Sequence, residues 1–488
     1  MAAETRQHPD DQVFEIEQRG IQLIPAAERH GRPRDLFFMW LGTNLNVFYI
    51  VNGAIVVALG LSFTQALLVI AAGNLCFFCV GLTSLQGPKT GTSTFVISRA
   101  AYGPKGGRGL SLFNWLTCVG YEASGLALIV LATLELLAKA GVHHPSAGVK
   151  AAVIVGAAAV QFVLPLYGHA TILAAEKWLA WLFIPLFVIM AILVAPKVHV
   201  GSLPTGAGWG TVMVAIAVII SGGGLPWANT GSDYSRYLPA DSSAREIFWW
   251  SSLGGLIPSV LLSVLGAAVA SAVKTASDPI AGVPLALPGW VAVPYLILAI
   301  LTLLAVNTID LYSSGLTLQA IGIPVRRPAA ALIDLVICVA VTFVAIFSAS
   351  FNRLYLEFLS LLIVWLAPWF AIYIADWLLR RGRYEPASLV RENGGRYWRR
   401  GGVHWPGVIA QVAGMAASLM WINSPAYTGP LASRAGGSDL SVFTGMAAGG
   451  LVYWLLARRT VPAEESMPVS IPAVTGAAVT GTAVPEAE

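Results

Sequence analysis

Long apolar runs separated by short polar segments recur along almost the whole of this sequence. A helix needs about 20 mostly apolar residues to cross the roughly 30 Å hydrocarbon layer of a membrane. Runs of about that length are found at 36–59, 65–83, 110–138, 149–168, 175–195, 209–228, 248–273, 290–320, 329–348, 356–379, 406–424 and 441–457. We therefore predict an all-α polytopic membrane protein with twelve transmembrane helices, whose first partner is the lipid bilayer.

The composition excludes several other classes of protein. Only 11% of the residues are charged, less than half of the usual share in a soluble domain, and 56% are hydrophobic. A soluble enzyme, a nucleic-acid-binding protein and a disordered scaffold are therefore excluded. We expect no intramembrane enzyme, metal site or cofactor either, because all seven histidines lie in the tails or near the ends of the predicted spans. Cys76 and Cys79 lie inside an apolar run, where we expect buried thiols.

The distribution of lysine and arginine indicates the orientation in the membrane. With twelve spans and a cytoplasmic N-terminus, 23 of the 29 basic residues fall in cytoplasmic segments. Such an excess is typical of the cytoplasmic side. We therefore expect a multi-pass protein of the cell membrane, plasma or inner, with both termini in the cytoplasm. The charged start of the chain predicts that there is no signal peptide.

Two predicted spans contain sequences that interrupt a helix. Span one (36–59) includes LGTNLNVFYIVNG, with three asparagines among glycines, and span six (209–228) runs into SGGGLPWANTGSD. Three glycines followed by Pro226 do not comfortably continue a helix, and a break in mid-membrane is tolerated only beside a cavity. Corresponding breaks in two five-helix halves are typical of an inverted-repeat transporter with its substrate near the midplane. The alternative is that these glycines only permit close helix packing.

Spans eight (290–320) and three (110–138) carry further polar residues at membrane depth. In span eight, Asn307, Asp310, Ser314 and Thr317 form one polar stripe at helical spacing. Span three carries hydroxyl and amide side chains on one face. Such groups usually face a cavity or one another, so we expect both spans to border the substrate cavity.

The chain divides into six segments on this interpretation. We expect a cytoplasmic N-terminal tail (1–35), a first five-helix repeat (36–195) and a second five-helix repeat (207–379). A basic cytoplasmic loop (380–405), two additional C-terminal helices (406–457) and a disordered cytoplasmic tail (460–488) follow. The basic loop is most simply a solvated connector that touches anionic lipid head groups.

Several motifs resemble those of the nucleobase:cation symporter family, specifically its purine–cytosine permease branch. They are RGIQLIPAAERHGRPRDLFFMWLGTNLN, GPKTGTSTFVISRAAYG, FNWLTCVGYE, PWANTGSDYSRYLP and NTIDLYSSGLTLQ. The resemblance runs from about residue 19 to residue 400 and implies a leucine-transporter-like fold with a 5+5 inverted repeat, broken helices 1 and 6, and two additional helices. It also implies the import, together with a cation, of cytosine, a purine, allantoin, a hydantoin or a related ring.

The resemblance also suggests which residues bind the substrate. Relatives stack the base on a tryptophan six residues before an aspartate, here Trp227, and on an aromatic residue in span three, here Tyr121. The span-eight asparagine of the family falls on Asn307, whose amide both donates and accepts hydrogen bonds. Asn46 and the backbone near Gly224 would complete the cavity.

One departure from the family pattern bears on the substrate. Relatives place Asn or Gln four residues after the span-three aromatic, whereas this chain has Gly125, so that a ligand-binding group is missing or is replaced by Ser124. Asp233, Arg236 and the loop residues Lys89, Arg99 and Lys105 are expected at the cytoplasmic surface, where they would hold loop geometry or a closed gate.

The coupling ion is expected to be H⁺ rather than Na⁺. Sodium-coupled relatives carry a Ser/Thr pair just before the span-eight asparagine, where this chain has Ala305 and Val306. Backbone carbonyls near Gly42 would supply only some of the oxygens that sodium needs. Asp310 and Glu122 are buried carboxyls, and burial favours the neutral form of such a group, so either can load and release a proton. Structural hydrogen bonding is the rival interpretation for both, and the alternatives for the whole protein are a sodium-coupled symporter or a facilitative permease.

Overall fold

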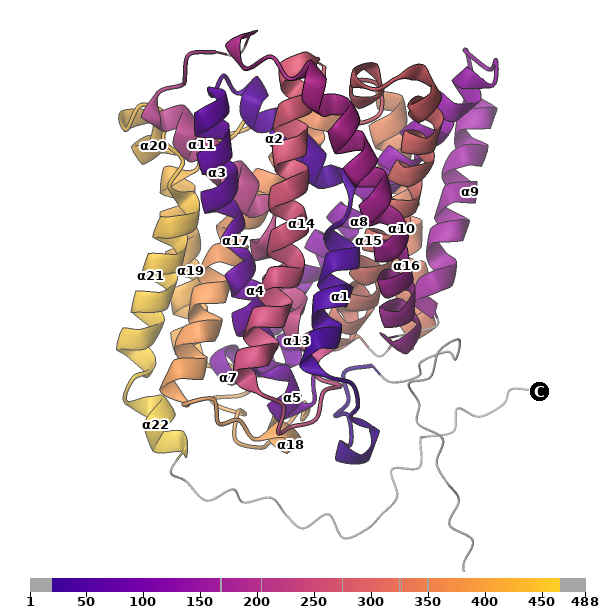
Figure 1. Cartoon of the computed structure of the whole chain (residues 1–488). Coiled ribbons are helices and arrows are strands. Elements are labelled where there is room, and N and C mark those ends of the chain that lie inside the picture. The colour runs from indigo at the N-terminus through magenta and orange to yellow at the C-terminus, as the bar shows by residue number, and fades with distance from the viewer. Residues whose placement is uncertain are drawn as a thin grey trace, which may run out of the picture.

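The computed structural model describes residues 20–465 except 167, 168, 203, 274, 324, 326, 349 and 350. This part of the chain is built from helices, and its one β feature is an isolated bridge between Asn423 and Thr428. Figure 1 shows long helices standing side by side in one bundle. The longest are α8 (Arg108–Lys139), α10 (His169–Val194), α14 (Ala244–Ala272), α15 (Gly289–Ala320) and α17 (Phe351–Leu379). The predicted all-α fold is confirmed.

Other helices complete the bundle. They are α3 (Phe63–Asn74) with α4 (Phe77–Ser84), α9 (Ala147–Leu166), α16 (Arg327–Ser348), α19 (Trp405–Trp421) and α21 (Ser441–Ala457). Within the described residues, eight helical stretches are long and apolar enough to cross a membrane, or nine with the bent pair of span one. Two shorter apolar helices, Ala147–Val163 and Ser441–Ala457, add to these. The count of twelve spans stays a prediction.

Spans one and six are broken, as their sequences predict. Span one consists of α1 (Pro33–Asn44) and α2 (Val47–Ala58), which are bent by 61° relative to each other. Span six consists of α11 (Trp209–Ser221), the single turn α12 (Gly224–Trp227) and α13 (Gly231–Ser235). Both breaks lie well inside the bundle (Figure 1), so the chain there can expose backbone groups to a cavity.

Small residues bring two of these helices into very close contact. A Cβ atom at Gly53 of α2 would lie 1.8 Å from the carbonyl oxygen of Ser263 in α14. A Cβ at Gly266 of α14 would lie 2.0 Å from the carbonyl oxygen of Ile50 in α2. Glycine is therefore required at both positions for the two backbones to touch. Close helix packing, the alternative weighed for the span-six glycines, also operates within span six, where a Cβ at Gly224 would lie 2.5 Å from the backbone nitrogen of Phe77.

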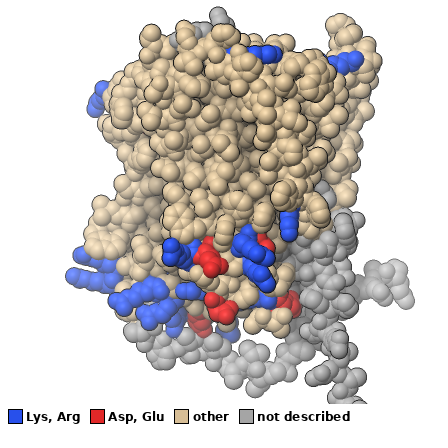
Figure 2. Space-filling model, viewed as in Figure 1, with Lys and Arg blue, Asp and Glu red and all other residues tan. Residues whose placement is uncertain are grey.

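Several short helices gather at one end of the bundle, whereas the short helix α20 (Pro430–Arg434) lies at the other (Figure 1). Those that gather at the first end include α5 (Gly87–Thr90), α6 (Thr94–Ile97), α7 (Arg99–Tyr102), α18 (Pro386–Leu389) and α22 (Thr460–Glu465). Figure 2 shows that Lys and Arg side chains on the viewed face cluster at this end, with few at the opposite end. The three-dimensional charge pattern therefore agrees with the orientation expected for the cytoplasmic side.

Charged residues at that end are buried inside it. Arg99, Asp233 and Arg236 are each at most 2% exposed, so the expectation that they lie at the surface is wrong for these three, whereas Lys89 and Lys105 are exposed. The Asp233 carboxylate accepts hydrogen bonds from the backbone N–H of Thr94 at 2.8 Å and from its hydroxyl at 3.0 Å. The guanidinium of Arg236 donates to the carbonyl of Gly20 at 2.8 Å. These groups tie the loop before α6 and the N-terminal segment to span six.

The two predicted tails lie mostly outside the described residues, which begin at 20 and end at 465. The part of the C-terminal tail that is described forms the helix α22. Its Glu464 accepts a hydrogen bond from Arg380 at 3.3 Å and pairs with Arg399. The expected disorder is therefore wrong for these six residues, because two arginines of the basic segment hold them.

Candidate functional site

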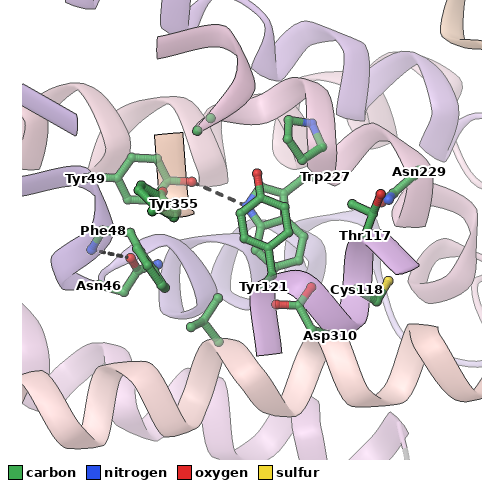
Figure 3. Close-up of a pocket in the computed structure, with 14 residues that line it drawn as sticks. Asn46, Phe48, Tyr49, Thr117, Cys118, Tyr121, Trp227, Asn229, Asp310 and Tyr355 are labelled. Atoms are coloured by element: carbon green, nitrogen blue, oxygen red, sulfur yellow. Dashed lines mark hydrogen bonds between the residues drawn. The ribbon is translucent and has the colours of Figure 1, made fainter. Parts of the chain in front are cut away.

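A cavity of about 490 Å³ lies where the breaks of spans one and six face each other (Figure 3). Span one contributes Asn46, Phe48 and Tyr49 to its wall, and the glycine turn of span six contributes Gly222 and Gly223. The predicted position of the cavity, beside two interrupted helices, is therefore observed.

Side chains from three other segments satisfy the backbone groups that the span-six break leaves free. The hydroxyl of Tyr121 in α8 donates to the carbonyl of Ser221 at 2.7 Å. The amide of Asn52 in α2 donates to the carbonyl of Gly222 at 3.0 Å. The backbone N–H of Gly224 donates to the sulfur of Cys76, between α3 and α4, at 3.1 Å. These contacts make a mid-membrane break energetically tolerable, because an unpaired backbone group there costs several kcal/mol.

Asn46 forms the break in span one. Its side-chain oxygen accepts a hydrogen bond from the backbone N–H of Phe48 at 3.0 Å, which caps α2, and its amide nitrogen donates to the carbonyl of Thr43 at 2.8 Å. The side chain lines the cavity, but both of its polar atoms are engaged locally. Its structural role is therefore to end one helix and begin the next.

The predicted aromatic pair meets at the cavity. Trp227 and Tyr121 both line it, and Figure 3 labels both side chains. The indole N–H of Trp227 donates to the hydroxyl of Tyr49 at 3.3 Å, and its ring packs edge-on against Trp40 with centroids 5.7 Å apart. The ring of Tyr121 packs edge-on against Phe358 at 4.9 Å. Both rings are held by these contacts and present apolar surface to the cavity.

Three further cavity residues were not among those expected from the sequence. Phe48 of α2 and Tyr355 of α17 stack with centroids 5.5 Å apart and an angle of 20° between their planes. Asn229, in the PWANTGSD motif, also lines the cavity, and its amide donates to the side-chain oxygen of Asn114 at 2.5 Å. Asn229 could have been predicted from the sequence as a cavity residue, because its amide side chain comes directly after the helix break in span six. Phe48 and Tyr355 carry no signal in the sequence, because aromatic side chains are common in every span.

Asp310 projects into the cavity from the continuous helix α15. Its side chain is 5% exposed, and Figure 3 shows its carboxyl on the side where Tyr121 and Trp227 lie. Among the described residues, no hydrogen bond or ion pair to this carboxyl is found. The predicted proton-binding residue is thus placed directly at the substrate cavity.

Asn307 lies one turn before Asp310 but does not line the cavity. Its amide nitrogen donates to the backbone carbonyl of Glu122 at 3.1 Å and to the side-chain oxygen of Gln161 in α9 at 2.8 Å. Ser124 is also away from the cavity wall, and its hydroxyl donates to the carbonyl of Gly120 at 2.7 Å. Substrate binding by these two residues, and by Gly224, stays a prediction.

Glu122 faces the outer helices instead of the cavity. Its carboxylate accepts a hydrogen bond from the thiol of Cys338 in α16 at 3.2 Å. Asp334, one turn earlier in α16, accepts hydrogen bonds from Ser314 at 2.6 Å and from the indole of Trp115 at 2.5 Å. The sequence interpretation did not select Asp334, although an acidic residue inside a membrane span is a signal in itself.

Gly42 lies against a second carboxyl that the sequence interpretation did not select. A Cβ at Gly42 would lie 2.5 Å from a side-chain oxygen of Glu176 in α10 and 2.5 Å from its backbone carbonyl. The Glu176 side chain is 1% exposed. Gly42 therefore allows α1 and α10 to touch, and its predicted role in cation coupling stays a prediction.

Comparison with known proteins identifies the family. A family model described as a permease for cytosine/purines, uracil, thiamine and allantoin matches residues 23–456. The chain belongs to this family. It falls in the purine–cytosine branch of the nucleobase:cation symporters, as the motifs implied. It is accordingly a membrane transporter and not an enzyme.

Individual relatives are distant but match over nearly their whole length. YxlA of Bacillus subtilis is 28% identical over 453 residues, which cover 91% of this chain and 96% of that protein. The purine-cytosine permease fcyB of Emericella nidulans is 28% identical over 472 residues, covering 90% of this chain and 88% of that protein.

Solved structures show the shared fold. Mhp1, a nucleobase-cation-symport-1 family transporter, in a closed conformation with bromovinylhydantoin bound, has a TM-score of 0.73 at 19% identity, with 91% of this chain and 95% of that chain covered. The inward-facing conformation of Mhp1 has a TM-score of 0.71 at 18% identity, with 92% and 98% covered. The predicted leucine-transporter-like fold with its inverted repeat is supported by these similarities.

Proposed function

We propose that this protein is a secondary active importer of a nucleobase or a related small heterocycle, driven by proton symport through alternating access. The single observation that carries the proposal is the cavity between the two helix breaks, with Trp227 and Tyr121 on its wall and one carboxyl, Asp310, projecting into it. An apolar aromatic wall suits a flat ring, since stacking on an aromatic side chain contributes about 1–3 kcal/mol per base.

A proton is the ion that best suits this chain. Val306 lines the cavity and Ala305 is buried beside it, so neither side chain offers an oxygen to sodium. The carboxyl of Asp310 lies at the same cavity and binds a proton without needing further ligands. Energetically one proton suffices, because 100 mV supplies about 2.3 kcal/mol and a unit pH gradient adds about 1.4 kcal/mol. Together they support several-hundred-fold accumulation of a neutral ligand.

Uptake of labelled ligand into intact cells or proteoliposomes tests this proposal. Labelled adenine or cytosine is the first probe, with sodium fully replaced by choline at fixed external pH, and a protonophore added afterwards. We expect accumulation above the external concentration that survives sodium replacement and collapses with the protonophore. Uptake that requires sodium and survives the protonophore would support the sodium-coupled alternative. Equilibration without accumulation would support a facilitative permease.

A further inference from the structure

We propose that Asp310, carrying the coupling proton, hydrogen-bonds directly to the edge of the transported base, so that proton and base bind as one cooperative unit. The inference rests on the proposed function and deepens it in two ways. It places the proton at the substrate instead of at a separate ion site. It also specifies the substrate by the pattern of donors and acceptors on its edge.

The position of Asp310 is the first step. It is the acidic residue of the cavity wall, and its neighbours there are aromatic rings, Val306, Cys118 and Thr117. The hydroxyl of Thr117 already donates to the carbonyl of Phe113 at 2.9 Å. Because Asn46 and Asn229 are held by neighbouring groups in the same way, the carboxyl of Asp310 is the wall group best placed to pair with a ligand.

The electrostatic surroundings are the second step. Six titratable side chains interact with the charge of Asp310, namely Tyr49 of α2, Cys118, Tyr121 and Glu122 of α8, Tyr234 of α13 and Cys338 of α16. None of these six carries a positive charge. An unpaired carboxylate in such a site is costly, whereas the neutral acid needs only hydrogen-bond partners. A bound proton therefore neutralises Asp310, because none of these six neighbours supplies a compensating positive charge.

The chemistry of the carboxyl is the third step. A protonated carboxyl offers one O–H donor beside one carbonyl acceptor, whereas the ionised form offers two acceptors only. An adenine or cytosine edge offers a ring-nitrogen acceptor beside an amine donor, and a hypoxanthine or uracil edge offers one N–H beside one carbonyl. Each of these edges makes two hydrogen bonds with the protonated form. Guanine carries the hypoxanthine-type edge, N1–H beside the C6 carbonyl, and also two adjacent donors, N1–H and the amine, that match the ionised carboxylate, so it can pair with either form.

The proton balance follows from this pairing. Adenine, cytosine, hypoxanthine and uracil would bind with uptake of one proton, shared in the hydrogen bond between Asp310 and the base. Proton and base would be released together on the cytoplasmic side. Guanine can pair with either form of the carboxyl, so its binding should depend less on pH than that of adenine.

Binding measurements on the purified full-length protein test the inference. Adenine and guanine are titrated by calorimetry at several pH values above the point where adenine binds best, in buffers of different ionisation enthalpy. We expect the Kd for adenine to rise about tenfold per pH unit, with one proton taken up. The Kd for guanine should rise less steeply with pH, because guanine can also pair with the ionised form. Binding of adenine without proton uptake would overturn the inference, while failure of either base to bind would count against the proposed function instead.

Asp310→Asn provides the second test, because the amide is a fixed donor beside a fixed acceptor. This variant should bind adenine with a Kd that no longer changes with pH, should take up no proton, and should lose accumulation driven by a pH gradient. Glu122→Gln is the matched comparison, since Glu122 is a buried carboxyl of α8 that does not line the cavity and bonds to Cys338 of α16 instead. Loss of the pH dependence in Glu122→Gln with its retention in Asp310→Asn would overturn the inference. If Asp310→Asn does not fold, the proton uptake that accompanies adenine binding to the unmodified protein still decides.

Discussion

Gly125 of α8 lies directly against the side chain of Asn307 in α15: a Cβ atom at Gly125 would come within 2.3 Å of the amide oxygen and 2.6 Å of the amide nitrogen. The amide cannot easily move away, because its nitrogen donates to both Glu122 and Gln161. The departure from the family pattern at Gly125 thus has a structural consequence. The absence of a side chain at this position leaves room for the amide of Asn307 at the point where spans three, four and eight meet.

This contact predicts the effect of a single methyl group. Gly125→Ala should impair folding or uptake, because the new Cβ displaces a buried, hydrogen-bonded amide, and overpacking of this kind typically costs about 1–3 kcal/mol. In the double variant with Asn307→Gly the clash disappears, so thermal stability should recover relative to Gly125→Ala. The melting temperature in detergent measures this. A double variant that is less stable than either single variant would contradict the packing argument.

Asn307→Ala separates a direct role of Asn307 in binding from a structural one. The prediction from the sequence is a loss of uptake, since a ligand group would lose its partner at about 1–3 kcal/mol. Gln161→Ala is the matched variant, because it removes the partner of Asn307 without touching the predicted ligand contact. If Asn307 contacts the base, Asn307→Ala should weaken binding at least about fivefold more than Gln161→Ala. Equal losses of affinity and stability in the two variants would show that Asn307 acts only by holding the helices.

Trp227→Ala should weaken ligand binding by about 1–3 kcal/mol, or roughly five- to 150-fold, because an aromatic stacking surface is lost. Trp227→Phe keeps a flat ring and should lose less. Trp178→Ala is the control, since this tryptophan of α10 is 75% exposed on the surface of the bundle and should leave binding unchanged. Wild-type affinity in Trp227→Ala would contradict the aromatic wall.

The sequence predicted those parts of the site that violate the rules for a membrane helix. Asp310 was found in this way, because it is an acid at membrane depth, whereas Trp227 was suggested by the resemblance to the family and by its place after a run of glycines and a proline. Both lie at the cavity. The broken spans themselves were found by the same signal, since few other sequences interrupt a helix so clearly.

The sequence could not predict which neighbour each polar residue faces. Asn307 and Asp310 are three residues apart, about 60° around the helix, yet one faces α8 and α9 and the other faces the cavity. Tertiary packing decides between such directions. Phe48 and Tyr355 show the same limit, because one aromatic ring among many carries no mark of its position until helices far apart in sequence are brought together.

Because His404 is buried at the basic end of the bundle, we expect the stability of the protein to depend on pH. Burial and the nearby charge of Arg399 lower the pKa of His404 from 6.5 to about 4, and its ring nitrogen Nδ1 lies 2.8 Å from the carbonyl oxygen of Ala101. The folded protein therefore holds this ring neutral at a pH where the unfolded chain would protonate it. The contribution of His404 to stability is complete above about pH 6.5 and falls by about 1.4 kcal/mol per unit between pH 6.5 and about 4.

Melting temperatures measured in detergent from pH 7.5 to 4.5 check this expectation. His404→Gln keeps a hydrogen-bond donor without a group that titrates, so its melting temperature should fall less steeply with acid than that of the unmodified protein. His143→Gln is the control, because His143 is exposed in the loop between α8 and α9. Parallel curves for His404→Gln and the unmodified protein would contradict the prediction.

The last prediction concerns the orientation of the bundle, which rests on the excess of basic residues at the end where α22 lies (Figures 1 and 2). The four cysteines, Cys76, Cys79, Cys118 and Cys338, are first replaced by Ala, with uptake confirmed. Ser470→Cys then places a single thiol in the C-terminal tail. In a second variant, His144→Cys places a single thiol in the loop between α8 and α9, at the end of the bundle opposite the basic one. A membrane-impermeant maleimide added to intact cells should label the thiol at position 144 at once. The thiol at position 470 should react only after permeabilisation, because the positive-inside rule puts that end in the cytoplasm. Labelling of position 470 from outside, with position 144 protected, would mean that the bundle is inserted the other way round.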